Sequence, residues 1–310
     1  MVKVAHMYHQ RGLTQPQIAG QIGISQPSVS RLLKLAQELG IVRVTVEAPS
    51  GTFTEIEDAL ERRYGLSQVV VVDAGPSTVE GVIPVLGASA ATFLEMTLPT
   101  AEVVGISSWS ETLLAAVDAM HAPARGRTRY VVQVLGGLGR PTSQVYATRL
   151  TERLAELSHA RPLFLLGPGI TGTAEARQML LRDPSFDEVM SYYDRLSLLL
   201  TGIGSLTTPS RLIRAGGATL RDEDHRALRS KGAVGDICLR FFDENGQFVP
   251  SPLDDRVLGM SLAQLRGTRR VVAVAGGMGK FVAIRAACRG RLIHSLVTDL
   301  AVARKLDQEP

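Results

Sequence analysis

Short apolar runs alternate with amphipathic segments from residue 69 to the end of the chain, and this alternation restricts the possible folds strongly. The apolar runs have the length and composition of buried strands, and the segments between several of them have helical periodicity. Such alternation is typical of a largely parallel sheet covered by helices on both faces, so we predict a large α/β domain. The expected strands are Val69–Asp73, Glu102–Ile106, Tyr130–Leu135, Leu163–Leu166, Leu196–Ile203, Ile237–Phe242, Val271–Ala275 and Leu292–Val297. The clearest helices are expected at Ser110–Met120, Ser143–Ser158 and Lys280–Arg289.

The chain has 310 residues, of which 45% are hydrophobic, so it can hold one large domain and a small additional one. No window approaches the roughly 18 uninterrupted apolar residues of a membrane span. The start, Met1–Ala5, lacks the apolar core of a signal peptide, and we expect a cytoplasmic protein without a membrane partner. The two cysteines, Cys238 and Cys288, lack metal-ligand spacing and are expected to be buried, reduced thiols. Neither a metal nor a cofactor is expected.

The net positive charge of the chain lies entirely in its first 46 residues. This segment has five basic residues and a single acid, Glu38, whereas the remaining 264 residues carry 29 bases and 29 acids. A compact basic module beside a neutral domain is typical of a protein that binds a polyanion. A solvated basic face without a partner is the alternative that charge alone leaves open.

The spacing between Thr14 and Leu33 matches two short helices joined by a tight turn. Thr14 can cap the first helix, Gly23 can close it in the left-handed conformation, and Ser25 can cap the second. The expected core positions are Ile18, Ala19, Ile22 and Ile24, followed by Val29, Leu32, Leu33 and Leu39. This pattern predicts a helix-turn-helix, with an ordinary helical hairpin as the alternative.

Polar and basic side chains remain on the outer side of the second predicted helix. Amide, hydroxyl and guanidinium groups at a helix N-terminus suit the base edges and phosphates of a DNA major groove. We therefore predict that this helix binds a double-stranded DNA operator through Ser25, Gln26, Pro27, Ser28, Ser30, Arg31 and Lys34. The alternating run Ile41–Val46 is expected to form a wing, with Arg43 near a phosphate.

Glycine and hydroxyl residues follow several of the predicted strands, where a parallel sheet places its ligands. In Gly105–Thr112 a strand leads into a hydroxyl-rich turn that opens a helix, so N–H groups and hydroxyls can converge on an anion. A plain capped turn is the alternative. The glycine turns Gly136–Gly139 and Gly202–Ser205 would let the backbone approach a ligand, and Ala275–Lys280 would add a cation.

Lys280 and Asp236 are the charged candidates for this ligand site. Lysine is scarce in the chain, and Lys280 stands after a glycine turn at a strand end, so we expect it to bind an anion. Asp236 lies between apolar residues and must be hydrogen-bonded, either in a structural turn or to a ligand hydroxyl. The Ala275–Lys280 turn is not a Walker A loop, and a proline within Gly167–Gly172 argues against a dinucleotide site.

The sequence resembles the SorC/DeoR-type sugar-binding transcriptional regulators over nearly its whole length. The likeness lies in the helix-turn-helix and in later blocks, namely Gly105–Ser107, Gly232–Ile237, Ala273–Lys280, Ala283–Ala287, Arg289–Gly290 and Leu296–Asp299. The resemblance implies a winged helix-turn-helix DNA-binding domain, here called the reader, at residues 1–50. It also implies an effector-binding and oligomerisation domain at residues 54–310, similar to sugar-phosphate isomerases and deaminases but without catalysis. A phosphorylated sugar would be the effector, and the protein would form a homo-oligomer, either a dimer or a tetramer.

By that resemblance, Ser107, Ser108, Ser110, Thr112 and Lys280 would hold the phosphate, next to the strand-end Gly105. Gly137, Gln144 and Asp236 would face the sugar. The chain departs from the family pattern at Ser108–Ser110, where Trp-Gly often follows the first serine, and at His294, where asparagine is common. Both departures concern the identity of the effector and not the architecture.

An enzyme is the competing function, namely a sugar-phosphate isomerase or deaminase with an accessory DNA-binding module. Such an enzyme needs a positioned base near the sugar carbons, usually two carboxylates or a carboxylate and a histidine. The strand ends offer Asp236 and no convincing second acid. The sequence therefore favours an effector-controlled regulator over an enzyme.

Overall fold

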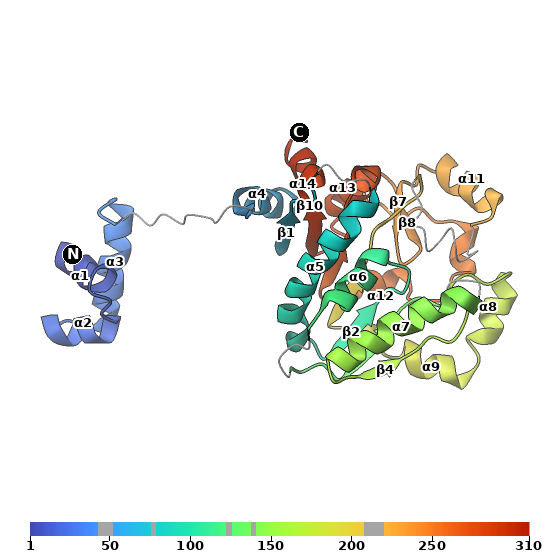
Figure 1. Cartoon of the computed structure of the whole chain (residues 1–310), viewed down its shortest axis with the longest axis horizontal. Helices are drawn as coiled ribbons and strands as arrows, with labels where there is room; N and C mark the ends of the chain where they lie inside the picture. The colour runs from blue at the N-terminus through green and yellow to red at the C-terminus, as the bar shows by residue number, and fades with distance from the viewer. Residues whose placement is uncertain (43–51, 76–78, 122–125, 138–140, 208–219, 310) are drawn as a thin grey trace. The chain divides into compact units, whose positions relative to one another are not determined.

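The computed structural model describes residues 1–42, 52–75, 79–121, 126–137, 141–207 and 220–309, without the side chains of residues 79–80 and 141–147. The chain divides into two compact units, Met1–Pro49 and Ser50–Pro310 (Figure 1). Each unit has its own hydrophobic core and is described by itself.

The N-terminal unit consists of three short helices around a small apolar core. They are α1 (Val2–His9), α2 (Gln15–Ile22) and α3 (Gln26–Glu38). The buried core residues come from all three helices and are Val4, Ala5, Met7, Ile18, Ala19, Val29, Leu33 and Ala36. Leu39, the last apolar position of the predicted helical pattern, follows the last turn of α3 with 60% of its surface exposed, whereas Ala36 is fully buried.

The predicted helix caps are confirmed. Thr14 and Gln17 form a reciprocal capping box at the start of α2, and Gly23 ends that helix in the left-handed conformation with φ of 68°. The Ser25 hydroxyl accepts a hydrogen bond of 3.3 Å from the Ser28 N–H at the start of α3. These local contacts fix the turn between the two helices of the reader. Most of the predicted wing, residues 43–46, lies outside the described residues.

The larger unit is built on a sheet whose seven described strands are all parallel, in the order β1-β10-β9-β5-β2-β3-β4. This arrangement confirms the predicted α/β fold. The strands are β1 (Gln68–Val72), β2 (Val103–Ile106), β3 (Tyr130–Gln133), β4 (Arg161–Leu163), β5 (Leu198–Thr201), β9 (Val271–Val274) and β10 (Ser295–Asp299).

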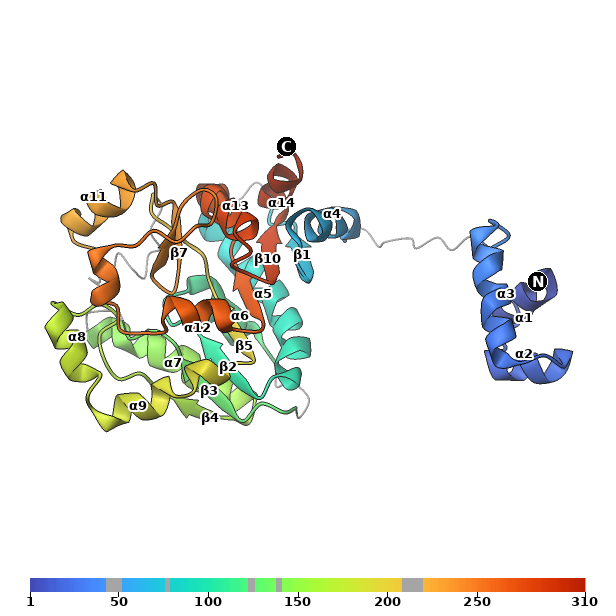
Figure 2. The ribbon, with the colours of Figure 1, turned by 180° about the vertical axis from the view of Figure 1, so that it is seen from behind.

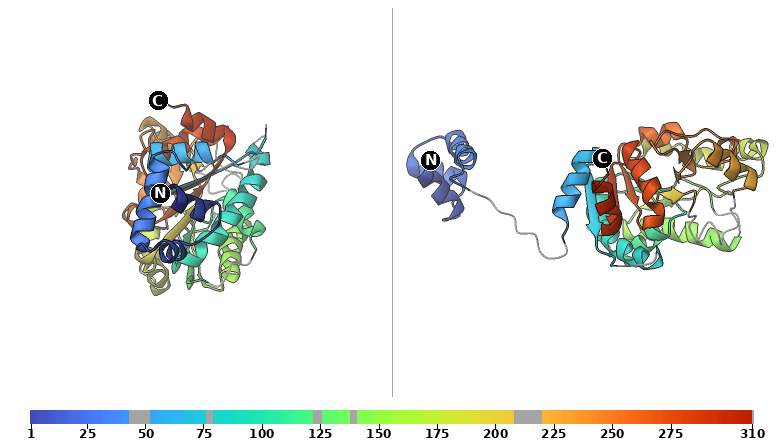
Figure 3. Two further views of the ribbon diagram at one scale, coloured as in Figure 1. Left: turned by 90° about the vertical axis from the view of Figure 1, so that its left-hand side faces the viewer. Right: turned by 90° about the horizontal axis from the view of Figure 1, so that it is seen from above.

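Helices cover both faces of this sheet. One face packs against α5 (Val79–Thr97), α6 (Glu111–Ala119) and α7 (Pro141–Leu157), which lie in front in Figure 1. The other face packs against α4, α9, α12, α13 and α14, several of which come forward in Figure 2. Their bounds are α4 (Thr54–Tyr64), α9 (Pro184–Met190), α12 (Leu262–Gly267), α13 (Phe281–Arg289) and α14 (Leu300–Asp307). Figure 3 shows the layers from two further directions.

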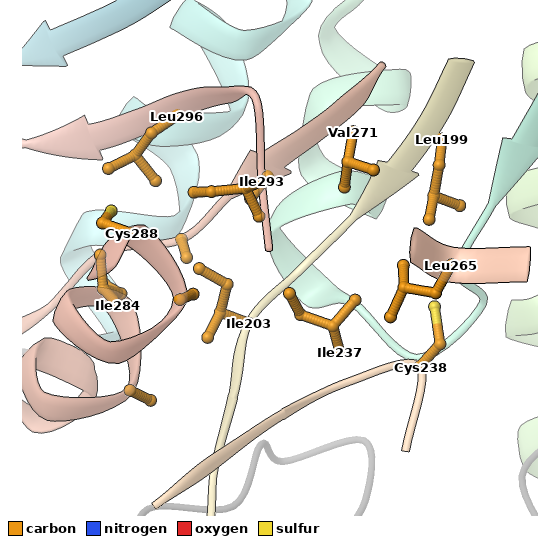
Figure 4. Packing of buried hydrophobic residues seen from close by; sticks show 14 of the residues in the cluster. Leu199, Ile203, Ile237, Cys238, Leu265, Val271, Ile284, Cys288, Ile293 and Leu296 are labelled. Atoms are coloured by element: carbon orange, nitrogen blue, oxygen red, sulfur yellow. The ribbon is translucent and has the colours of Figure 1, made fainter. Parts of the chain in front are cut away.

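A small antiparallel sheet follows the carboxyl end of β5. It contains β6 (Gly204–Ser205), β7 (Gly235–Ile237) and β8 (Arg240–Phe242). Ile203 and Ile237 pack with residues of the large sheet such as Leu199 and Val271, so the two sheets share one core (Figure 4).

The prediction of one continuous strand over Ile237–Phe242 is wrong. The chain reverses at Cys238 and Leu239, whose φ angles of 52° and 60° are those that a tight two-residue hairpin turn requires. Glycine or asparagine usually occupies such a turn, so an apolar run without either residue gave no turn signal. Burial of both side chains offsets the conformational cost of the turn.

Helix α5 belongs to the core of the domain. Among the described residues, one helical stretch, Gly81–Thr100, is long and apolar enough to cross a membrane by length and composition. Half of it is buried inside the domain, and Leu86 and Leu94 are fully buried in the cluster beneath the sheet. The remaining described helical segments are α8 (Ala174–Leu180), α11 (Asp222–Ser230) and the 3-10 segments η1 (Leu98–Thr100), η2 (Tyr193–Arg195), η3 (Pro252–Asp255) and η4 (Met278–Lys280).

Candidate effector site and DNA interface

The carboxyl ends of β2 and β5 mark the point where the order of the sheet reverses. The chain proceeds from β2 through β3 to β4 on one side, and from β5 through β9 to β10 on the other. In open parallel sheets, ligands bind in the crevice that forms where two neighbouring connections diverge in this way. The turns after β2, β5 and β9 therefore form the candidate site.

The turn after β2 ends in a capped helix N-terminus. Ser110 caps α6, since its hydroxyl accepts a hydrogen bond of 3.2 Å from the Leu113 N–H. Ser107, Ser108, Ser110 and Thr112 are all buried, so their hydroxyls need partners within the protein or a ligand. The N-terminus of α6 carries partial positive charge and favours an anion.

Most hydroxyls of this turn are bonded to neighbouring strand ends. Ser108 donates to the Leu135 carbonyl oxygen at 2.9 Å, and Thr112 donates to the Val274 carbonyl oxygen at 2.9 Å. The Ser110 and Thr112 hydroxyl oxygens lie 2.9 Å apart. These bonds fasten the turn after β2 to the ends of β3 and β9. Because the Ser108 and Thr112 hydroxyls already donate to carbonyl oxygens, an anion at this turn would bind the backbone N–H groups of α6 more readily than these two hydroxyls.

The segment Gly202–Gly204, which links β5 to β6, contacts three of the predicted site residues. A side chain at Gly202 would approach the Ser110 hydroxyl to 2.8 Å, and one at Gly204 would collide with the Asp236 carboxylate. The Ile203 carbonyl oxygen accepts a hydrogen bond of 3.0 Å from Lys280 Nζ. The structure therefore brings Ser110, Asp236 and Lys280 around one short stretch of backbone.

Lys280 is positioned by the glycine turn after β9. Gly277 has φ of 88°, a conformation that favours glycine, and its N–H donates to Asp299 Oδ2 at 2.6 Å. The other oxygen of Asp299 caps α14 by accepting from the Val302 N–H at 3.1 Å. Burial lowers the pKa of Lys280, while the nearby charges of Asp236 and Glu111 oppose this shift. A half-buried cation of this kind gains from an anionic partner.

Asp236 is the predicted site acid, and its charge and that of Glu111 both act on Lys280. Its Oδ2 accepts a hydrogen bond of 3.0 Å from the Leu239 N–H in the β7–β8 hairpin. Burial raises the pKa of Asp236 to about 6, against the lowering effects of that hydrogen bond and of the Lys280 charge. Asp236 can therefore bind a sugar hydroxyl as an acceptor above this pH and as a donor below it.

For two other predicted site residues, Gly105 and Gly137, the structure shows roles in packing and backbone hydrogen bonding. Gly105 is inside β2, where a side chain would collide with Val134 and Leu196, so packing alone requires a glycine there. Gly137 uses its backbone in hydrogen bonds of 2.8 and 2.7 Å with Gly167 and Gly169. The side chain of Gln144 lies outside the described residues. Roles for these three residues in binding stay predictions.

The sequence did not single out Trp109 and Asp299, and both position the site. Trp109 is buried and donates from Nε1 to the Gly136 carbonyl oxygen at 2.8 Å, which joins the turns after β2 and β3. Asp299 holds the glycine turn that precedes Lys280. The sequence signal that was available for Asp299 is an acidic residue at the end of an apolar run, where it must be hydrogen-bonded.

His294 lies before β10, at the opposite edge of the sheet from these turns, and so away from the candidate effector site. The expectation that it reflects effector identity is therefore not supported by its position. Both cysteines are free and buried, as predicted. No group of three or more His, Cys, Asp or Glu side chains gathers as a metal site within the described ranges.

The predicted DNA-binding residues lie at the N-cap of α3 and within residues 26–34 of that helix. Gln26, Ser30, Arg31 and Lys34 are exposed, as are Ser25 and Pro27, whereas Ser28 is half-buried. The Ser28 hydroxyl lies 2.9 Å from that of Ser25 and accepts a bond of 3.3 Å from Arg31 Nη2. Lys34 forms only a loose, exposed ion pair with Glu38 at 3.8 Å. Arg31 and Lys34 can therefore turn toward DNA at little cost.

Similarity to known proteins extends over the whole chain. The Sugar-bind family model, which describes a sugar-binding domain, matches residues 49–306. The deoxyribonucleoside regulator of Bacillus subtilis is 31% identical over 98% of this chain and 96% of its own length. The sorbitol operon regulator of Klebsiella pneumoniae is 30% identical over 99% of this chain and 96% of its own. The crystal structure of full-length SorC from that organism covers 99% of this chain and 97% of its own, with a TM-score of 0.76 and 28% identity.

Proposed function

Because the chain belongs to the SorC/DeoR family of sugar-binding transcriptional regulators, we propose that a phosphorylated sugar at the β2, β5 and β9 turns controls its binding to an operator. The contacts of Gly202–Gly204 with Ser110, Asp236 and Lys280 carry this proposal, since they join an anion-binding helix terminus, a cation and a hydroxyl-binding carboxylate. The relatives are named as regulators and not as enzymes, so an isomerase or deaminase is not supported.

The phosphate is proposed to lie between the N-terminus of α6 and Lys280. The helix terminus supplies N–H donors and partial positive charge, and Lys280 supplies a full charge from a half-buried position. On binding, Lys280 would exchange its bond to the Ile203 carbonyl oxygen for stronger bonds to phosphate oxygens. The negative charge of the phosphate would thereby balance the charge of Lys280, which is partly removed from water.

The sugar is proposed to extend from the phosphate toward Asp236. A carboxylate accepts hydrogen bonds from one or two hydroxyls, so it selects for the positions of hydroxyls and not for the phosphate. Relatives are named for deoxyribonucleosides, sorbitol and erythritol, which are polyhydroxylated compounds or contain a sugar. For this chain we propose a phosphorylated sugar or sugar alcohol of similar size.

The reader is proposed to bind DNA with α3 in the major groove, as a homo-oligomer in the cytoplasm. One helix-turn-helix offers a small interface, and such readers usually bind palindromic sites as symmetric dimers. Assembly through the α/β domain would supply the second reader. An effector that binds differently to the DNA-bound and free states would shift the operator equilibrium.

A ligand screen on the full-length protein tests the proposal. Pentose, deoxyribose and hexitol phosphates are added, each beside its unphosphorylated counterpart, and the melting temperature is measured. A ligand that binds only the folded state raises this temperature. We expect a rise with phosphorylated compounds alone. A rise with the unphosphorylated sugars of equal size would contradict the phosphate site.

Lys280→Met locates the phosphate within the domain. We expect the effector to bind about tenfold or more weakly, as is typical when a hydrogen bond to a charged group is lost, with unchanged operator binding in its absence. Lys231→Met is the matched control, since Lys231 is exposed and its Nζ also donates to a carbonyl, that of Pro250 at 2.7 Å. Equal effector titrations of the operator complex for Lys280→Met and wild type would place the phosphate elsewhere.

A further inference from the structure

A hollow of about 290 Å³ lies at the amino edge of the large sheet, opposite the candidate effector site. Residues that precede or begin five adjacent strands, β1, β10, β9, β5 and β2, line it. The principal polar lining residues are Ser67, Thr100, Ser197, Arg269, Arg270 and His294. No acidic side chain lines the hollow.

Two arginines give this hollow an uncompensated positive charge. Arg269 is exposed and Arg270 is half-buried, and within the described ranges no ion pair joins either guanidinium to an acid. The charge of Arg270 contributes, after burial, to lowering the pKa of His294, which places the two side chains near each other. Guanidinium groups that line a hollow without an acid attract an anion.

His294 adds a hydrogen-bond donor of fixed orientation. Its Nδ1 accepts a hydrogen bond of 3.0 Å from the Val271 N–H, and its backbone N–H donates to the Val271 carbonyl oxygen at 2.8 Å. Because Nδ1 is an acceptor, the proton of the neutral ring is on Nε2. The ring can therefore donate from Nε2 to a ligand without protonation.

A second, smaller hollow of about 140 Å³ shares His294 and is lined by two further arginines, Arg266 and Arg291. Arg266 lies over the Phe248 ring at 5.1 Å. No acidic side chain lines this hollow either. Four arginines therefore border two adjoining hollows, in a domain whose bases and acids are equal in number overall. The local potential attracts anions.

We propose that the larger hollow binds a small anion through a phosphate or carboxylate group, with Arg269, Arg270 and His294 as its donors. Guanidinium groups bind both kinds of oxyanion in bidentate geometry, and the volume suits an anion of a few carbon atoms or fewer. This site is separate from the effector site, because β5 and β9, each four residues or roughly 13 Å long, lie between the two.

Arginine modification of the full-length protein tests this site directly. Phenylglyoxal labels accessible arginines, and peptide mass spectrometry locates the labels. We expect inorganic phosphate to slow the labelling of Arg269 and Arg270, compared with chloride at equal ionic strength, and to leave the exposed Arg304 unchanged. A parallel series with malonate distinguishes a carboxylate ligand from a phosphate. Unchanged labelling of Arg269 and Arg270 with both anions would overturn the proposal.

Variants separate this site from the effector site. Lys280→Met is expected to keep the protection of Arg269 and Arg270, because that lysine lies at the other edge of the sheet. In the Lys280→Met background, Arg270→Gln should weaken binding of the protecting anion about tenfold, measured by the rise in melting temperature, and Arg304→Gln should not. Loss of protection in Lys280→Met, or equal affinity of the two arginine variants, would refute the separate site.

Discussion

Replacing Asp236 by asparagine should change how the stability of the α/β domain depends on pH. Burial raises the pKa of Asp236 from its ordinary value of 3.8 to about 6. Between about pH 4 and 6 the folded protein therefore retains a proton that the unfolded chain has released. The free energy of unfolding contributed by this group falls as the pH rises through that interval, and the full penalty is present above it.

The size of this effect follows from the pKa difference. A shift of about two units corresponds to roughly 3 kcal/mol, and the partial exposure of Asp236 reduces the expected value to about 2 kcal/mol. Asparagine stays neutral at every pH and can still accept the Leu239 N–H bond with its amide oxygen. Relative to wild type, Asp236→Asn should therefore gain stability progressively from about pH 4 to 7.

Urea unfolding followed by tryptophan fluorescence measures the change. Trp109 is the single tryptophan of the chain and is buried beside the candidate site, so its signal reports on the α/β domain and not on the reader. Asp58→Asn, at an exposed position of α4, is the control and should track the wild type. Parallel pH profiles of unfolding free energy for Asp236→Asn and wild type would refute the assignment of a penalised carboxylate.

Three further variants test individual contacts. Arg31→Ala should weaken specific operator binding by about 1 to 3 kcal/mol if it contacts a guanine, and an unchanged ratio of specific to non-specific affinity in a gel-shift titration would instead indicate a phosphate contact. Ser25→Ala removes the cap of α3 and should destabilise the N-terminal unit by about 1 kcal/mol, measured by helix loss on heating. Thr112→Val leaves the Val274 carbonyl without this donor and should cost the α/β domain about 1 to 3 kcal/mol in urea; an unchanged midpoint would show that the bond carries no stability.

The reader was predictable because local signals determine it. Thr14, Gly23 and Ser25 act on backbone within a few residues of themselves, so their identities alone indicate the helix boundaries. The α/β fold was predictable for a related reason, since strand and helix periods are local. The hairpin at Cys238–Leu239 was missed because its turn conformation depends on burial that the surrounding sheet provides.

The candidate site was predictable in composition but not in its contacts. Glycine and hydroxyl residues at strand ends pointed to the turns after β2, β5 and β9, which the parallel topology then placed together. The sequence could not show that Thr112 bonds the Val274 carbonyl, or that Trp109 joins two turns, because each contact links residues far apart in the chain. Long-range pairing of this kind has no local signature.

The pairing of β1 with β10 determines the order in which the two units can fold during translation. β1 is the first described strand to emerge, yet its neighbour Ser295–Asp299 is the last of the described strands, so the sheet cannot be completed until residue 299 has been synthesised. The three-helix reader, whose contacts are all local, can fold much earlier. A nonsense mutation before residue 295 should therefore leave an intact DNA-binding module attached to an incomplete sensor. Because the second reader is proposed to come from assembly through the α/β domain, such fragments should bind an operator only weakly, and late truncations should behave as simple loss of function.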